Sequence, residues 1–147
     1  WPGRMEKIAD KPLIILDAAH NPAAFKKLAE NIYHSRSQFK NLHLIFSVLK
    51  DKDLNEILTE FANLNLSPKF YLAENSSFRT ASIDNLIKTV KSKSFKYQSF
   101  KDTAEASLAA LKSADSKDLI IAAGSFNTVF EAGIVFKSKK IRGGENG

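Results

Sequence analysis

The sequence predicts an α/β fold, a Rossmann-like three-layer domain in which helices cover both faces of a mostly parallel sheet of about six strands. Two patterns support this fold class. Short, wholly apolar runs such as residues 13–16 and 119–123 are typical of strands that are buried on both faces. Between such runs, apolar side chains recur every three or four residues, as they do on the buried face of a helix. Because strands and helices alternate along the chain, right-handed crossovers are expected to pair the strands in parallel.

The order of the elements follows from the same periodicity. The expected strands cover residues 13–16, 42–46, 69–73, 95–100 and 119–123. Each strand is followed by a helix, and the apolar positions of these helices lie within residues 25–33, 54–62, 83–90, 108–111 and 126–130. Residues 4–8, turning through residues 9–12, are expected to add an antiparallel hairpin at one edge, and the tail from about residue 138 is expected to be frayed. All 147 residues are expected to form a single domain.

Side chains that can cap a helix N-terminus stand before the expected helices. Asn21 precedes a proline, which is favoured in the first helical turn. Asp53 and Asp102 each stand three residues before a glutamate, which is the spacing of a capping box. Either Thr80 or Ser82 can cap the third helix. These side chains indicate where the helices begin more closely than the periodicity does.

The composition excludes several kinds of site. The sequence contains no cysteine, which rules out a disulfide scaffold, an iron–sulfur cluster, a thiolate zinc site and a cysteine nucleophile, and which suits a reducing compartment. The histidines His20, His34 and His43 are dispersed without metal-ligand spacing, so no metal site is expected. No apolar run approaches the roughly 20 residues that span a bilayer. We therefore expect a cytoplasmic protein with no transmembrane helix, no signal peptide and no membrane partner.

The net charge of +6 is compatible with a polyanionic ligand, either a nucleic acid or a molecule that carries phosphate. Most of the lysines, however, fall on the polar faces of helices and in loops, and no basic stripe is interleaved with aromatic residues. A solvated surface accounts for this charge, and no nucleic-acid partner is expected.

Polar segments gather at the edge of the predicted sheet where ligands bind in open parallel sheets, namely at the carboxyl ends of the strands. These segments are residues 17–22, 47–53, 74–79 and 124–125. Asp17, at the end of a buried strand, is suited either to accept hydrogen bonds from a ribose diol or to cap the following turn. His20 stands next to a helix start, where it can line a ligand site or form a buried hydrogen bond. Ser125 is expected to cap the last helix, and together with Gly124 it can equally form an anion site.

Common motifs for phosphate binding and for a serine nucleophile are absent from the sequence. There is no GxxxxGK[ST] phosphate loop, no GxGxxG dinucleotide fingerprint after the first buried strand and no GxSxG nucleophile elbow. Arg4 offers a guanidinium that suits a phosphate, although it can also be an ordinary surface residue. A doubly wound domain without its own phosphate loop is expected to work with a second domain that brings the triphosphate.

Four groups of residues together resemble a known family. They are Pro2-Gly3-Arg4-Met5-Glu6, then Asp17-Ala18-Ala19-His20-Asn21-Pro22, then Lys50-Asp51-Lys52-Asp53, and finally Gly124-Ser125-Phe126 followed by Glu131. In this order they resemble the C-terminal domain of folylpolyglutamate synthase and dihydrofolate synthase, which belong to the Mur ligase superfamily. The AHNP segment alone would indicate only the wider superfamily, whereas its combination with the first and third groups is specific to this branch.

The resemblance implies one part of an ATP-dependent ligase. In that family an N-terminal P-loop ATPase lobe, absent from this chain, activates a carboxylate of folate or dihydropteroate with ATP as an acyl phosphate, and L-glutamate then displaces phosphate to form an amide. The resemblance assigns Arg4 and Asp17 to ATP binding and Ser125 to glutamate binding. It assigns His20 to the glutamate site as the catalytic residue that orients or deprotonates the incoming amine. The resemblance further implies that ATP is the co-substrate and that Mg²⁺ is bound mainly by the absent lobe. It also implies a monomer, and the isolated chain is expected to be inactive.

Three residues depart from the usual pattern of this family. Ala18 stands where a glycine is common, Ser47 stands where a glycine often precedes the DKD motif, and Phe130 stands where the last helix often has a glycine. Two other interpretations stay open. One is a Mur-superfamily ligase for another carboxylate, and the other is a non-catalytic module that binds a nucleotide or a partner at the sheet edge. The choice between dihydrofolate synthase, folylpolyglutamate synthase and a bifunctional enzyme depends on the pterin pocket of the absent lobe.

Overall fold

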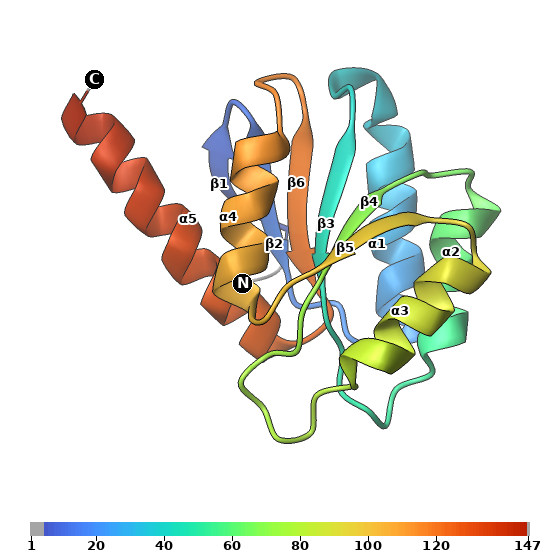
Figure 1. Cartoon of the computed structure of the whole chain (residues 1–147). Helices are drawn as coiled ribbons and strands as arrows, with labels where there is room; N and C mark the ends of the chain where they lie inside the picture. Colours follow the sequence, from blue (N-terminus) through green and yellow to red (C-terminus); the bar gives the residue numbers. More distant parts are fainter. Residues whose placement is uncertain (1–4, 147) are drawn as a thin grey trace.

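The middle layer of the structure is a six-stranded sheet in the order β1-β2-β6-β3-β4-β5 (Figure 1). The computed structural model describes residues 5–146, and the side chains of residues 5–139. The strands are β1 (Glu6–Asp10), β2 (Leu13–Asp17), β3 (Leu42–Phe46), β4 (Lys69–Leu72), β5 (Lys96–Ser99) and β6 (Leu119–Ala123). β1 pairs antiparallel with β2 at one edge, and the other strand pairs are parallel. The predicted fold class, with its edge hairpin, is confirmed.

Helices cover both faces of this sheet, as the sequence predicts (Figure 1). They are α1 (Pro22–His34), α2 (Leu54–Asn63), α3 (Ile83–Ser92), α4 (Thr103–Ser113) and α5 (Phe126–Asn146), with a short 3-10 helix, η1 (Arg36–Gln38), after α1. The first three α-helices pack on one face, where Phe25, Phe61 and Leu86 are buried. The last two pack on the other face through side chains such as Ala110 and Phe136. Because both faces are covered, all five residues of β6 are buried, which explains its wholly apolar sequence.

The predicted helix caps are present. The side chain of Asn21 accepts a hydrogen bond from the backbone N–H of Ala24, at 2.9 Å. Asp53 and Asp102 accept in the same way from the N–H three residues later, at 3.0 and 2.8 Å. Of the two candidates for the third helix, Ser82 is the residue that caps α3. Each cap satisfies an N–H group that the first turn of a helix otherwise leaves without a partner.

Both ends of the chain differ from the sequence-based boundaries. β1 extends to Asp10, which pairs with Leu13, so the hairpin turn contains only Lys11 and Pro12 instead of residues 9–12. A two-residue turn lets strand pairing continue to the end of the hairpin. At the other end, helical backbone continues to Asn146, whereas the sequence predicts a frayed tail from about residue 138. No proline interrupts this stretch, and a helix already started can extend at little cost per residue.

The three central strands end at the same level. Asp17 of β2 and Phe46 of β3 both pair with Ala123, the last residue of β6. The loops that follow these strands therefore start side by side, at the carboxyl edge of the sheet. This register brings together segments that are about a hundred residues apart in the sequence, and it creates the edge on which the candidate site lies.

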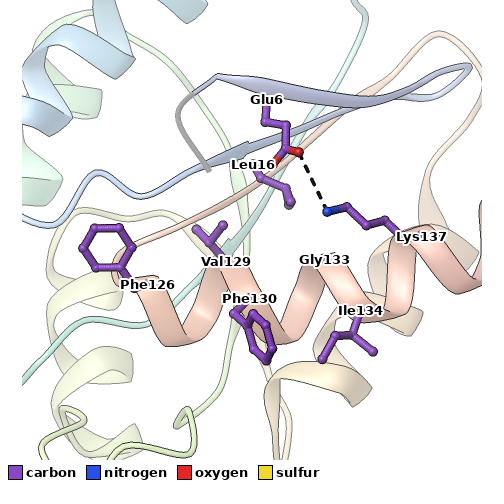
Figure 2. Close-up of a pocket in the computed structure, with 8 residues that line it drawn as sticks. All are labelled: Glu6, Leu16, Phe126, Val129, Phe130, Gly133, Ile134 and Lys137. Atoms are coloured by element: carbon purple, nitrogen blue, oxygen red, sulfur yellow. Dashed lines mark ion pairs between the residues drawn. The ribbon is translucent and has the colours of Figure 1, made fainter. Parts of the chain in front are cut away.

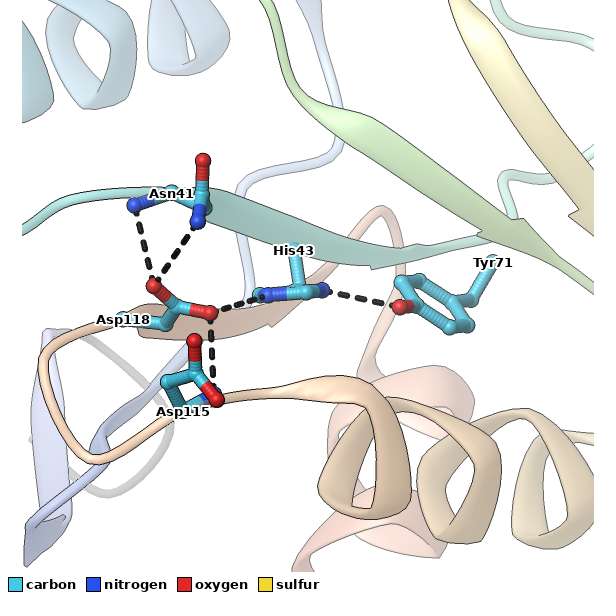
Figure 3. Close-up of polar contacts among 5 residues, drawn as sticks. All are labelled: Asn41, His43, Tyr71, Asp115 and Asp118. Carbon is cyan, nitrogen blue, oxygen red and sulfur yellow. Dashed lines mark hydrogen bonds and ion pairs between the residues drawn. The ribbon is translucent and has the colours of Figure 1, made fainter.

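A buried polar network ties β3 to the loop before β6 at the opposite, amino-terminal edge (Figure 3). Nε2 of His43 donates to Oδ2 of Asp118 at 2.9 Å, and Nδ1 of His43 lies 2.8 Å from the hydroxyl of Tyr71. Burial alone would raise the pKa of the Asp118 carboxyl, but donors from the Asp115 backbone, His43 and Asn41 together hold its pKa below the usual value. Because an ionised carboxylate only accepts hydrogen bonds, His43 carries a proton on Nε2, where its ring faces Asp118. The network lies at the edge away from the candidate site and acts on stability.

Candidate functional site

Asp17 stands at the carboxyl end of β2 and is 7% exposed. Its Oδ1 accepts a hydrogen bond from the backbone N–H of Ala19 at 2.9 Å, which orders the first turn of the loop that leads to α1. The carboxylate also lines a cavity of about 200 Å³ together with Met5 and with side chains of α1 that include Lys27 and Asn31. The structure thus shows the turn contact, which is one of the two roles that the sequence left open for Asp17, and it also places Asp17 beside a cavity.

His20 lies in the same loop and is partly buried. Its Nδ1 is 3.0 Å from the carbonyl oxygen of Ala18. Because a carbonyl oxygen can only accept, Nδ1 carries a proton, and Nε2 is the ring nitrogen left to accept one. The imidazole also packs against the ring of Phe126, with 6.0 Å between the ring centroids. These contacts hold the ring in one orientation and direct its basic nitrogen away from the Ala18 backbone.

The turn before α5 fits tightly between two other loops. The backbone N–H of Gly124 donates to the carbonyl oxygen of Ala19 at 2.9 Å, which joins the end of β6 to the loop that carries His20. Gly124 has φ +123°, and a Cβ atom there would lie 1.7 Å from the carbonyl oxygen of Ser47. The position therefore requires glycine, both for its backbone conformation and for this close approach.

Ser125 follows this glycine and is 4% exposed. Its Oγ accepts from the backbone N–H of Thr128 at 3.1 Å, so it caps α5 as the sequence predicts. The same oxygen accepts from Nδ2 of Asn75 at 2.9 Å and lies 3.0 Å from Oγ1 of Thr128. The hydroxyl of Ser125 is thus held by contacts with Asn75 and Thr128.

The structure brings His20 and Ser125 together and sets Asp17 apart. The Gly124–Ala19 hydrogen bond and the His20–Phe126 ring contact join the loop after β2 to the start of α5. Asp17 belongs to the same loop, but its cavity opens on the side of α1.

Arg4, which the sequence assigns to ATP binding, lies outside the described residues. No metal site was predicted, and within residues 5–139 no group of three histidine and acidic side chains is arranged to hold a metal ion.

The sequence did not single out Asn75, although it lies within one of the polar segments predicted for this edge. Its side chain reaches across from the loop after β4 to Ser125, fifty positions further along the chain. Ser76, its neighbour, donates to Oε2 of Glu131 on α5 at 2.6 Å. The only signal for Asn75 in the sequence was its place in a loop that follows a strand. Its contact with Ser125 depends on the fold.

The residues of the DKD motif stabilise the loops at the carboxyl edge of the sheet. Asp53 caps α2, and Asp51 forms an exposed ion pair with Arg79 at 3.2 Å. The backbone N–H of Lys50 donates to the carbonyl oxygen of Arg79 at 2.8 Å. The motif thus fastens the loop after β3 to the loop after β4.

An apolar groove runs along α5 from this edge (Figure 2). It has a volume of about 300 Å³ and lies between α5 and the β1–β2 hairpin, where Lys137 and Glu6 form an ion pair at 3.8 Å. Phe126, Phe130 and Ile134 are exposed along it. Because the spacing of four residues repeats on one side of a helix, these three side chains form a continuous apolar stripe.

None of the helices in the described part of the chain has both the length and the apolarity to cross a membrane.

Comparison with known proteins identifies the family. The sequence profile described as "Mur ligase, glutamate ligase domain" matches residues 3–126. The chain belongs to this Mur ligase family. The match covers all six strands and stops at the first residue of α5, so it includes every loop of the carboxyl edge.

Several members of this family are similar to the chain over most of its length. A dihydrofolate synthase/folylpolyglutamate synthase of Haemophilus influenzae is 31% identical over 139 residues, which are 87% of this chain and 31% of that protein. E. coli FolC, in complex with DHPP and ADP, superposes with a TM-score of 0.83 at 26% identity, over 95% of this chain and 32% of that one. The bifunctional folylpolyglutamate synthase/dihydrofolate synthase of Yersinia pestis, complexed with AMPPNP and Mn ion, gives a TM-score of 0.79 at 29% identity, over 91% of this chain and 30% of that one. The chain spans about a third of the length of these Mur ligase relatives.

Proposed function

We propose that this chain is the C-terminal domain of an ATP-dependent ligase that adds L-glutamate to folate or dihydropteroate, and that it supplies part of the ATP and glutamate sites. The observation that carries the proposal is the junction of the His20 loop with the turn at Gly124 and Ser125, where the three central strands end. The names of the relatives, which are synthases of folates and of folylpolyglutamates, support the same substrate class.

The proposed reaction forms one amide bond for each ATP. A carboxylate oxygen of the folate or dihydropteroate attacks the γ-phosphorus, and ADP leaves with the electrons of the broken P–O bond. The amine of L-glutamate then attacks the acyl carbon, loses a proton, and displaces inorganic phosphate that carries the original carboxylate oxygen. Most of the rate enhancement in such a reaction comes from holding the two reactants in line and excluding water.

His20 is suited to the second of these steps. Its proton on Nδ1 points to the Ala18 carbonyl oxygen, so Nε2 can accept the proton that the amine must lose. In this proposal His20 orients or deprotonates the amine of glutamate, and Ser125 belongs to the same glutamate site through the turn that it caps. Asp17 binds the nucleotide through its ribose, and Arg4 contacts the phosphates.

The remaining components lie on other parts of the proposed enzyme. ATP is the co-substrate, and Mg²⁺ is held mainly by an N-terminal P-loop ATPase lobe of the same polypeptide. The nucleotide and manganese in the names of the similar structures support a metal–nucleotide complex of this kind. We assign no metal ligand among the described residues of this chain, which offer no suitable group of three side chains. We further propose a cytoplasmic monomer, and the lack of cysteine suits that compartment.

The experiment uses the complete polypeptide that contains this chain. ADP release is measured with ATP, Mg²⁺ and L-glutamate, with dihydropteroate or folate added or omitted, and the acyl phosphate is tested with a substrate labelled with ¹⁸O in its carboxylate. We expect release that requires both the carboxylate substrate and glutamate, with one ¹⁸O atom transferred to phosphate. The 147-residue chain alone is expected to be inactive.

Two outcomes would favour the other interpretations. ADP release that requires an amino acid together with a different added carboxylate, such as a cell-wall precursor, and that folate and dihydropteroate do not support, would indicate a Mur-superfamily ligase for another carboxylate. A polypeptide without turnover, in which ADP shifts the amide resonances of Asp17 and its neighbours, would indicate a nucleotide-binding module instead.

A further inference from the structure

The buried amide of Asn75 joins the end of β4 to the start of α5. Its Nδ2 donates to Oγ of Ser125 at 2.9 Å and lies 3.3 Å from Oγ1 of Thr128. Its Oδ1 accepts from the backbone N–H of Ser77 at 2.9 Å, which fixes the orientation of the amide. Asn75 is 6% exposed, so these contacts are shielded from water. An amide that uses both ends in this way is a rigid link between two loops.

The hydrogen-bond capacity of Ser125 is filled by this link. A hydroxyl oxygen offers two lone pairs and one proton. The amide of Asn75 and the backbone N–H of Thr128 occupy the lone pairs, so the proton of Ser125 goes to Oγ1 of Thr128 at 3.0 Å. With no donor or acceptor left over, the hydroxyl orders the turn and leaves direct contact with a ligand to its neighbours.

This ordered turn acts on the loop that carries His20. Gly124, next to Ser125, donates to the carbonyl oxygen of Ala19, the residue before His20. Phe126, on the other side of Ser125, packs against the His20 ring. A shift of Ser125 would therefore move His20 through a hydrogen bond and through a ring contact at the same time.

We infer that Asn75 is a positioning residue of the proposed glutamate site: by holding the hydroxyl of Ser125, it sets the place of the turn against which His20 packs. The inference rests on the proposed function, because it takes His20 to act on the amine of glutamate. Asn75 touches neither substrate in this scheme. Its effect should fall on glutamate and leave ATP unaffected, since Asp17 lines a different cavity on the side of α1.

The test compares KM for L-glutamate with KM for ATP in the complete polypeptide. Asn75→Ala is expected to raise KM for glutamate about tenfold and to change KM for ATP by less than about twofold, because displacement of the turn that adjoins the proposed glutamate site weakens the binding of glutamate. Thr128→Val keeps the shape of a buried side chain but removes the acceptor for the Ser125 proton, and it should raise KM for glutamate in the same direction. The Asn75→Ala and Ser125→Ala changes should be less than additive when combined, because they remove the same contact.

The control breaks a second contact between the same loop and α5. Ser76→Ala removes the hydroxyl that donates to Glu131 at the exposed surface, and both KM values should stay within about twofold. The inference is overturned if Asn75→Ala and Thr128→Val leave KM for glutamate unchanged, or raise KM for ATP equally, while the unaltered polypeptide turns over. If the unaltered polypeptide shows no glutamate-dependent ADP release, the proposed function fails and the inference with it. If Asn75→Ala does not fold, the nearly isosteric Thr128→Val decides by the same criterion.

Discussion

Gly124 lies directly against the backbone of Ser47: a Cβ atom at Gly124 would come within 1.7 Å of the Ser47 carbonyl oxygen. This contact joins the ends of β6 and β3, two neighbouring strands of the sheet. Gly124 also donates to Ala19 in the loop after β2, and the loop after β3 is fastened to the loop after β4 through Lys50 and Arg79. The shape of the candidate site therefore depends on a position that has no side chain.

Gly124→Ala should destabilise the chain strongly. The added methyl group meets backbone, which cannot move aside as a side chain can, and φ of +123° is unfavourable for alanine. We expect a loss of about 3 kcal/mol in the free energy of unfolding, measured by urea denaturation followed by circular dichroism. Gly133→Ala is the matched control, because its Cβ would meet only Cδ1 of Leu16 at 3.1 Å. That change should stay within about 1 kcal/mol, since alanine favours a helix over glycine by a similar amount. Equal losses in the two variants would contradict this account.

The network around Asp118 predicts a pH dependence of stability. Hydrogen bonds hold the folded-state pKa of its carboxyl below its ordinary value of 3.8. The stabilisation is therefore complete above the unfolded-state pKa near 3.8, and it is lost as the pH falls through the lower folded-state pKa. Asp118→Asn should cost about 3 kcal/mol at pH 7, because donors of His43 and Asn41 lose a buried charged acceptor. The difference in the free energy of unfolding between the unaltered chain and Asp118→Asn should shrink below about pH 4.

Denaturation at several pH values between about 2 and 7 measures this difference. Asp115→Asn is the control: the backbone N–H of Asp115 donates to Asp118, while its own side chain is exposed. That variant should follow the unaltered chain at every pH. Parallel stability curves for the unaltered chain and Asp118→Asn would show that the carboxylate does not contribute through its ionisation.

The sequence predicts most of the fold because its local signals agree with one another. Apolar runs, helical periodicity and caps such as Asp53 and Asp102 all indicate the same elements. The limits of the edge hairpin were wrong, because they depend on the pairing of Asp10 with Leu13, which only the assembled sheet determines. Helix α5 runs past the expected end because glycine weakens a helix without stopping it.

The candidate site was predicted only in part. Asp17, His20 and Ser125 stand at strand ends and helix starts, which are positions that a sequence reveals. Asn75 stands in an ordinary polar loop, and its importance comes from a contact with a residue that is distant in the sequence. The saturation of the Ser125 hydroxyl depends on the same three-dimensional contact.

His20→Gln tests the proposed role of the imidazole in the complete polypeptide. Glutamine can still form a hydrogen bond, but its side chain cannot accept a proton from the amine. We expect kcat to fall about a hundredfold, which is typical for the loss of a general base, with KM for ATP nearly unchanged. His34→Gln, at the exposed far end of α1, is the control and should have no effect on kcat. An unchanged kcat in His20→Gln would remove the catalytic role and leave His20 as a packing residue against Phe126.

Asp17→Ala separates the two roles that its position allows. If the carboxylate binds the nucleotide, KM for ATP should rise about tenfold in the complete polypeptide without unfolding of the domain. If Asp17 serves only the turn, the loss of the hydrogen bond from Ala19 should lower the melting temperature and leave ATP kinetics unchanged. Asp17→Asn sharpens the comparison, because an amide oxygen can still accept from Ala19 but carries no charge and offers one acceptor in place of two. A nucleotide role predicts that Asp17→Asn keeps the stability and still raises KM for ATP, whereas a turn role predicts that it behaves as the unaltered protein in both measurements.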